Sequence, residues 1–248
     1  MEATIFTILF RVPAIIIAIT VGVLGYLIYI NTRGATKGWI YFSTGAISFM
    51  FWAITAILFM IVFPNDALRF FTGALFLGLI SIFIPYGYTK LANDFGVKMP
   101  SFVKAPYVLG LVIATYMVFV LLNLGKPFTL ATFTSLSHMT LGFAMLYACV
   151  PTYYLMKQTK VSAWVFAFIF CLVVGLSIQW GQYYSNCCST ELSQSEICKS
   201  FDLDYQRMYP GDCIGPVVQS GAFYQLFLLL GIISATISKY KIWQQVRT

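Results

Sequence analysis

Long apolar stretches separated by short polar segments dominate this chain. Seven of them are long enough to cross a membrane as helices, because about 20 apolar residues span the roughly 30 Å of hydrocarbon. They cover residues 6–30, 39–63, 70–88, 107–124, 128–156, 161–180 and 217–238. The runs are too long for strands and lack a period of two. The pattern predicts an all-α membrane protein, in which residues 1–248 form a single seven-helix transmembrane domain.

The composition supports this prediction and excludes several other classes of protein. Sixty per cent of the residues are hydrophobic and only 9% are charged, whereas an ordinary globular domain is about 25% charged. So few charges cannot cover the surface of a soluble fold of this size. A soluble enzyme, a disordered chain and a nucleic-acid-binding domain are therefore excluded. We expect an integral protein of the plasma membrane with the lipid bilayer as its solvent.

The basic residues predict the direction of the spans, because Lys and Arg concentrate in cytoplasmic segments. If the N-terminus is outside, the inner side holds Arg33, Lys37, Lys90, Lys98, Lys104, Lys157, Lys160, Lys239, Lys241 and Arg247. The outer side holds Arg11, Arg69, Lys126, Lys199 and Arg207, together with every acidic residue except Asp94. The net charge of +7 therefore sorts by membrane side. We expect the N-terminus outside and the C-terminus inside.

The one large connection, residues 183–215 between the sixth and seventh spans, is rich in cysteine. It carries Cys187, Cys188, Cys198 and Cys213, and the predicted topology places it outside, where disulfides persist. A bond between the adjacent Cys187 and Cys188 would be strained, so we expect each to pair with Cys198 or Cys213. A zinc site is less favoured, because the loop has neither His nor a CxxC spacing. The prediction is a disulfide-stapled extracytoplasmic loop.

The spans offer few groups for chemistry. His138 is the only histidine, whereas haem b bound between spans needs a pair and other metal sites need more ligands. The number and direction of the helices resemble those of opsins, but the predicted seventh span has no lysine for a Schiff base, and Lys239 lies at its inner edge. Buried acids suited to a proton pump are also missing. We expect no enzyme activity, catalytic residue, metal or other cofactor.

Polar residues inside the spans concentrate towards the outer half. They form a candidate outward-facing pocket beneath the cysteine loop, made by Arg11, His138, Gln179, Gln182 and Gln225. The alternative, which we favour, is that these side chains lie at the headgroup level or hydrogen-bond between helices. Pro85 and Pro151 occur in similar Pro-x-x-Tyr sequences near the inner ends of their spans. These prolines are either paired hinges or ordinary kinks followed by interface anchors.

Small residues predict where helices approach closely, since helix packing in lipid depends on them. They are Gly22, Gly25, Gly73, Gly78, Gly110, Ala114, Gly142, Gly175 and Gly231. These small residues and the lack of a catalytic group favour a non-catalytic accessory or structural subunit of a larger membrane complex. Its partners would be other membrane subunits. The alternative is a seven-helix sensor or receptor that binds a small ligand in the outer pocket. A small-solute transporter ranks third.

Overall fold

The structure, a computed structural model, describes residues 2–63, 66–122, 130–158, 163, 167, 169–171, 173, 230–231 and 233–244. Its elements are α1 (Glu2–Asn31), α2 (Gly38–Ile57), the π-helical turn η1 (Leu58–Val62), α3 (Asp66–Asp94), α4 (Ala105–Leu122) and α5 (Leu130–Gln158). Residues 233–244 are also helical, and we call them the C-terminal segment. The described part of the chain contains no strand, so the predicted helical character is confirmed there.

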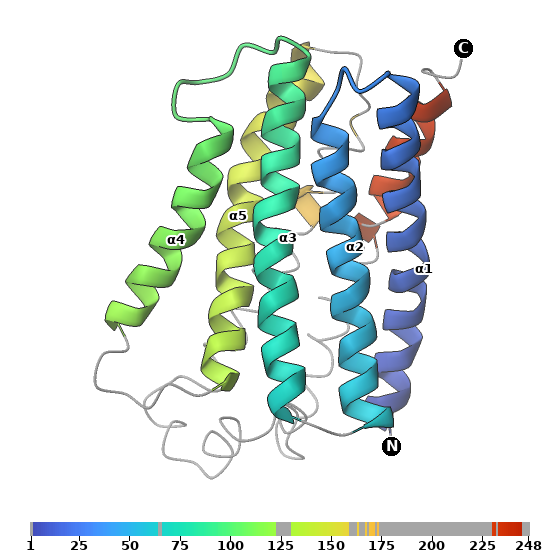
Figure 1. Cartoon of the computed structure of the whole chain (residues 1–248), viewed down its shortest axis with the longest axis vertical. Coiled ribbons are helices and arrows are strands. Elements are labelled where there is room, and N and C mark those ends of the chain that lie inside the picture. Colours follow the sequence, from blue (N-terminus) through green and yellow to red (C-terminus); the bar gives the residue numbers. More distant parts are fainter. Residues whose placement is uncertain are drawn as a thin grey trace.

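The helices stand side by side in an up-and-down arrangement (Figure 1). Helix α2 packs between α1 and α3, and α3 also packs against α5. Helix α4 lies at the edge of the bundle and leans away from its neighbours towards its C-terminal end (Figure 1). The C-terminal segment lies at the end of the bundle where α1 ends and α2 begins, whereas the N-terminus lies at the opposite end.

Among the residues that the structure describes, three helices are long and apolar enough to cross a membrane. They are Arg11–Asn31, Gly38–Ile57 and Phe71–Asp94, which fall on the first three predicted spans. Helices α4 and α5 fall on the fourth and fifth apolar stretches and differ from their predicted bounds by two residues at each end. The hydrophobic runs therefore locate α1 to α5 well, because a helix in lipid must satisfy its backbone hydrogen bonds within the segment.

The end of α3 is tied to the start of α2 by one carboxylate. Asp94 receives a hydrogen bond from the Gly38 backbone N–H at 3.2 Å, and its other oxygen lies 2.8 Å from the Lys90 ammonium. The connection that follows α3 is held against α5 by Gln158, whose side-chain amide exchanges two hydrogen bonds with the Lys98 backbone. These contacts fix the register of α2, α3 and α5 at the end of the bundle that holds the C-terminal segment.

Several predictions fall on residues that the structure does not describe. The loop 183–215 and its four cysteines lie outside the described residues, and so do most of the sixth span and the first half of the seventh. The other two cysteines, Cys149 in α5 and Cys171, are half-buried free thiols.

Candidate functional site

The structure describes only one side chain of the predicted outer pocket. Arg11 in α1 turns inward and places its guanidinium carbon 4.4 Å from the ring centroid of Trp52 in α2. His138 lies in α5, but its side chain is not described, and Gln179, Gln182 and Gln225 lie outside the described residues. The pocket therefore stays a prediction, with Arg11 placed against α2.

Pro85 and Pro151 both lie inside continuous helices, α3 and α5. Both are buried, and a threonine hydroxyl lies near each of them. Thr89 donates to the Pro85 carbonyl oxygen at 2.8 Å, and Thr152 donates to the Ala148 carbonyl oxygen at 2.8 Å. Neither proline ends its helix, and their role as hinges stays a prediction.

The predicted small residues of α1 and those of α4 differ in their surroundings. In α1, Gly25 lies directly against the Ser43 side chain of α2, and a Cβ atom on Gly22 would touch Ile47 at 3.4 Å. In α4, a Cβ atom on Gly110 would meet nothing within 4 Å, and Ala114 one turn later is also exposed. The small residues of α1 therefore join two helices of this chain, whereas the Gly110–Ala114 seam faces outward.

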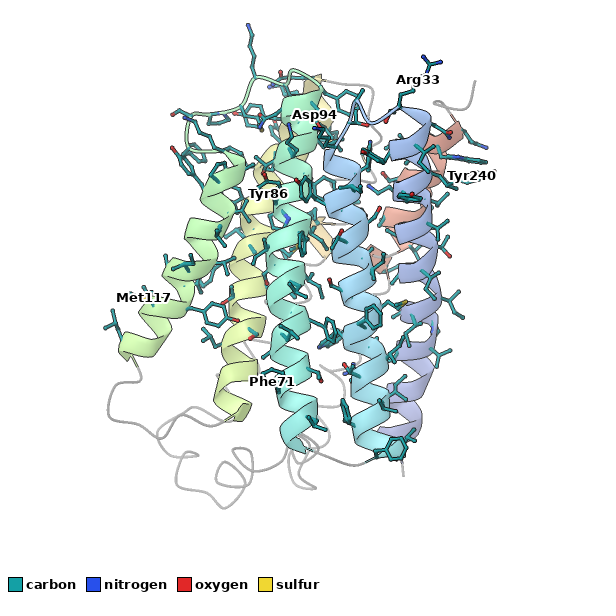
Figure 2. The ribbon with its side chains drawn as sticks, viewed as in Figure 1. Arg33, Phe71, Tyr86, Asp94, Met117 and Tyr240 are labelled. Carbon is teal, nitrogen blue, oxygen red and sulfur yellow. The ribbon has the colours of Figure 1, made fainter. Side chains whose placement is uncertain are left out.

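Helix α4 buries only a narrow stripe of its surface. Val108 and Val112 face the bundle, and the Tyr116 hydroxyl lies 2.9 Å from the Ser137 hydroxyl of α5. The rest of the described helix surface is largely exposed, namely Tyr107, Leu109, Gly110, Ile113, Ala114, Met117, Val118 and Leu121. Met117 lies at the outer edge of the molecule (Figure 2) and is 61% exposed. This face surrounds the Gly110–Ala114 seam with apolar side chains.

A lysine is buried among aromatic rings at the end of the bundle that holds the C-terminal segment. The Lys239 nitrogen lies 3.7 Å from the ring centroids of both Trp39 and Phe42, and 5.5 Å from that of Tyr88. We call these three residues of α2 and α3 the aromatic cage. Lys239 is 0% exposed, and the cage residues are at most 2% exposed. A cation within about 6 Å of a ring centroid is attracted to the ring face, by about 2 kcal/mol when desolvated.

Close approach of two helix backbones builds the walls of the aromatic cage. A Cβ atom on Gly38 would lie 2.6 Å from the Gly87 carbonyl oxygen, and one on Gly87 would lie 2.9 Å from the Phe42 backbone nitrogen. Each glycine adjoins a cage residue in sequence, Trp39 after Gly38 and Tyr88 after Gly87. The rings of Phe42 and Tyr88 meet edge to face with centroids 5.2 Å apart. The glycines thus allow rings from α2 and α3 to share one site.

Lys239 has no hydrogen-bond partner for its nitrogen among the residues that the structure describes. Asp94 lies at the same end of the bundle, as does Arg33 (Figure 2), but Asp94 is bound to Lys90 and Gly38. An unpaired charge at membrane depth is costly, so the ring faces are the main compensation that these residues offer to an ammonium ion.

The sequence predicts Lys239 at the inner edge of the seventh span, among the basic residues of the inner side. The structure buries it, because it lies on the inward stripe of the C-terminal segment with Ala235, Ser238 and Ile242. Tyr240 and Lys241, on the other face, are exposed. The helical spacing of this stripe could have indicated from the sequence that Lys239 is buried. The aromatic cage could not be predicted, because the cage residues and Lys239 come from three distant parts of the chain.

No group of three or more His, Cys, Asp or Glu side chains that could hold a metal occurs among the described residues. A scan against protein-family models and searches of curated proteins and of solved structures found no match for this chain. The structure therefore offers two features for interpretation, the outward Gly110–Ala114 seam and the aromatic cage around Lys239.

Proposed function

We propose that the chain is a seven-span integral protein of the plasma membrane, with its N-terminus outside and its C-terminus inside. Three apolar helices support membrane insertion. The inside assignment is supported by the connections α1–α2 and α3–α4, which carry Arg33, Lys37, Lys98 and Lys104 and lie at the end of the bundle near the C-terminal segment. In this topology, the loop 183–215 is extracytoplasmic and stapled by disulfides among its cysteines.

We propose further that the protein is a non-catalytic accessory subunit of a larger membrane complex. The observation that carries this proposal is the Gly110–Ala114 seam, which faces outward on α4, the helix at the edge of the described bundle (Figure 1). Small residues one turn apart let two helix backbones approach closely, and helix association in lipid depends on such packing rather than on a hydrophobic driving force. The small residues Gly22 and Gly25 of α1 already pack against α2 of the same chain.

The two sides of α4 differ in exposure, and the exposed side is the surface that we assign to a partner helix. Val108, Val112 and the Tyr116–Ser137 contact hold α4 to the bundle on one side. On the other side, exposed Met117 and Val118 extend the apolar face by one turn beyond the seam. A second transmembrane helix packed on this face would gain van der Waals contact with the α4 backbone at Gly110, which larger side chains would prevent.

The test is native mass measurement after gentle extraction of the protein from its own membrane. We expect a complex with other subunits that Gly110→Leu disrupts, because the added side chain blocks the seam without clashing inside the chain. Thr20→Leu is the matched control, because it adds bulk to an exposed position of α1 and should leave the complex intact.

Two results would overturn the subunit proposal. A protein that always runs alone would show that lipid alone covers α4. A complex made only of copies of this chain, and broken by Gly110→Leu, would show that the seam is a self-association surface.

A further inference from the structure

The burial of Lys239 is unusual for a lysine near a membrane surface. Such side chains extend their apolar stems along the protein and place the ammonium in water. The neighbouring Lys241 is exposed in this way. Lys239 instead places its nitrogen at equal distances of 3.7 Å from two ring centroids, with no exposed surface. The segment therefore directs one of two nearby amines into the bundle.

The surroundings of the Lys239 nitrogen consist of aromatic faces rather than hydrogen-bonding groups. No described residue donates a hydrogen bond to this nitrogen or accepts one from it, whereas three ring centroids lie within 5.5 Å of it. Aromatic faces carry negative electrostatic potential and attract an ammonium ion from several directions. Cages of this kind are used to recognise alkylammonium and methylated ammonium groups.

We propose that Trp39, Phe42 and Tyr88 form an ammonium-binding site, in which Lys239 is a tethered ligand that latches the C-terminal segment onto α2 and α3. When Lys239 is withdrawn, the site accepts a small alkylammonium ion in its place. The latch goes beyond the subunit function and does not depend on it, because its residues lie on α2, α3 and the C-terminal segment rather than on α4.

The test is chemical rescue of the purified full-length protein in detergent. Lys239→Ala removes three methylene groups and the ammonium, a fragment that propylammonium reproduces. We expect the variant to melt below the natural protein and propylammonium chloride to restore much of the loss in a saturable manner. Propanol, which has the same length without the charge, should restore less, as should sodium chloride at the same ionic strength.

Two matched variants separate the ammonium site from simple cavity filling. Ile242→Ala truncates an apolar neighbour on the same inward stripe, so propylammonium should have no advantage over propanol there. Lys239→Ala combined with Trp39→Leu enlarges the cavity and removes one aromatic ring, so the response to propylammonium should fall relative to the response to propanol. Equal rescue of Lys239→Ala by propylammonium and propanol would overturn the proposal.

Lys239→Met tests the charge even if the alanine variant does not fold, because methionine is similar in length and apolar. We expect Lys239→Met to melt about 5 °C below the natural protein, since the attraction of the rings for the cation is lost. A methionine variant at least as stable as the natural protein would contradict an ammonium-binding site.

Discussion

The contact between α2 and α3 at Gly38 leads to a sharp prediction about stability. In Gly38→Ala, the new Cβ atom would lie 2.6 Å from the Gly87 carbonyl oxygen and 2.6 Å from the Leu91 backbone nitrogen. Both are backbone atoms of α3, so no side-chain rotation relieves the clash and the helices must separate. Overpacking of this kind costs about 1–3 kcal/mol, and the better helix propensity of alanine offsets at most about 1 kcal/mol.

Because both clashing atoms belong to the backbone, the cost lies in the upper part of this range, about 2–3 kcal/mol. Subtracting the offset leaves a net loss of about 1–2 kcal/mol, which lowers the melting temperature of a chain of this size by about 2–8 °C. The assay is thermal unfolding in detergent, followed by tryptophan fluorescence and by recovery of the folded peak in gel filtration. Gly110→Ala is the control, because its Cβ atom meets nothing within 4 Å, and it should melt at or slightly above the natural protein. If Gly38→Ala and Gly110→Ala have the same melting temperature, the backbones of α2 and α3 are not in close contact at Gly38.

Three further predictions use the same thermal assay. Asp94→Ala should lower stability by about 1 kcal/mol, because the Gly38 N–H loses a charged acceptor; an unchanged melting temperature would argue against that tie. Tyr116→Phe should cost about 0.6 kcal/mol through loss of the contact with Ser137, whereas the same change at exposed Tyr26 should cost nothing measurable. Reductant should lower the melting temperature if loop 183–215 holds disulfides, since closing a loop of about 15 residues contributes roughly 3 kcal/mol; identical melting curves would show that no stabilising bridge is present.

The sequence located the described helices because lipid imposes a simple requirement on length and polarity. It could not say which small residues face a neighbour within the chain. Gly25 and Gly110 look alike as glycines within apolar runs, yet one lies against Ser43 and the other faces outward. That difference depends on how each helix is rotated, which lipid-facing apolar side chains do not specify, because both sides of such a helix are apolar.

The aromatic cage around Lys239 also could not be predicted from the sequence. Trp39 and Tyr88 occur near span ends, where aromatic residues are common as interface anchors. Nothing in the local sequence indicates that they face inward. Their inward placement follows from the tight contact of Gly38 with Gly87, a pair separated by 49 positions in the chain. Lys239 joins them only through tertiary packing, so the site is a property of the bundle rather than of a local motif.

In the proposed topology, the chain spans the membrane with its cysteine loop and its C-terminus on opposite sides. The direct measurement is labelling of reduced, sealed right-side-out vesicles with a membrane-impermeant maleimide, combined with detection of an epitope added after Thr248. We expect the loop cysteines to react in intact vesicles and the epitope to become accessible only after permeabilisation. The loop cysteines are Cys187, Cys188, Cys198 and Cys213. Access to the loop cysteines and the epitope from the same side would contradict this topology.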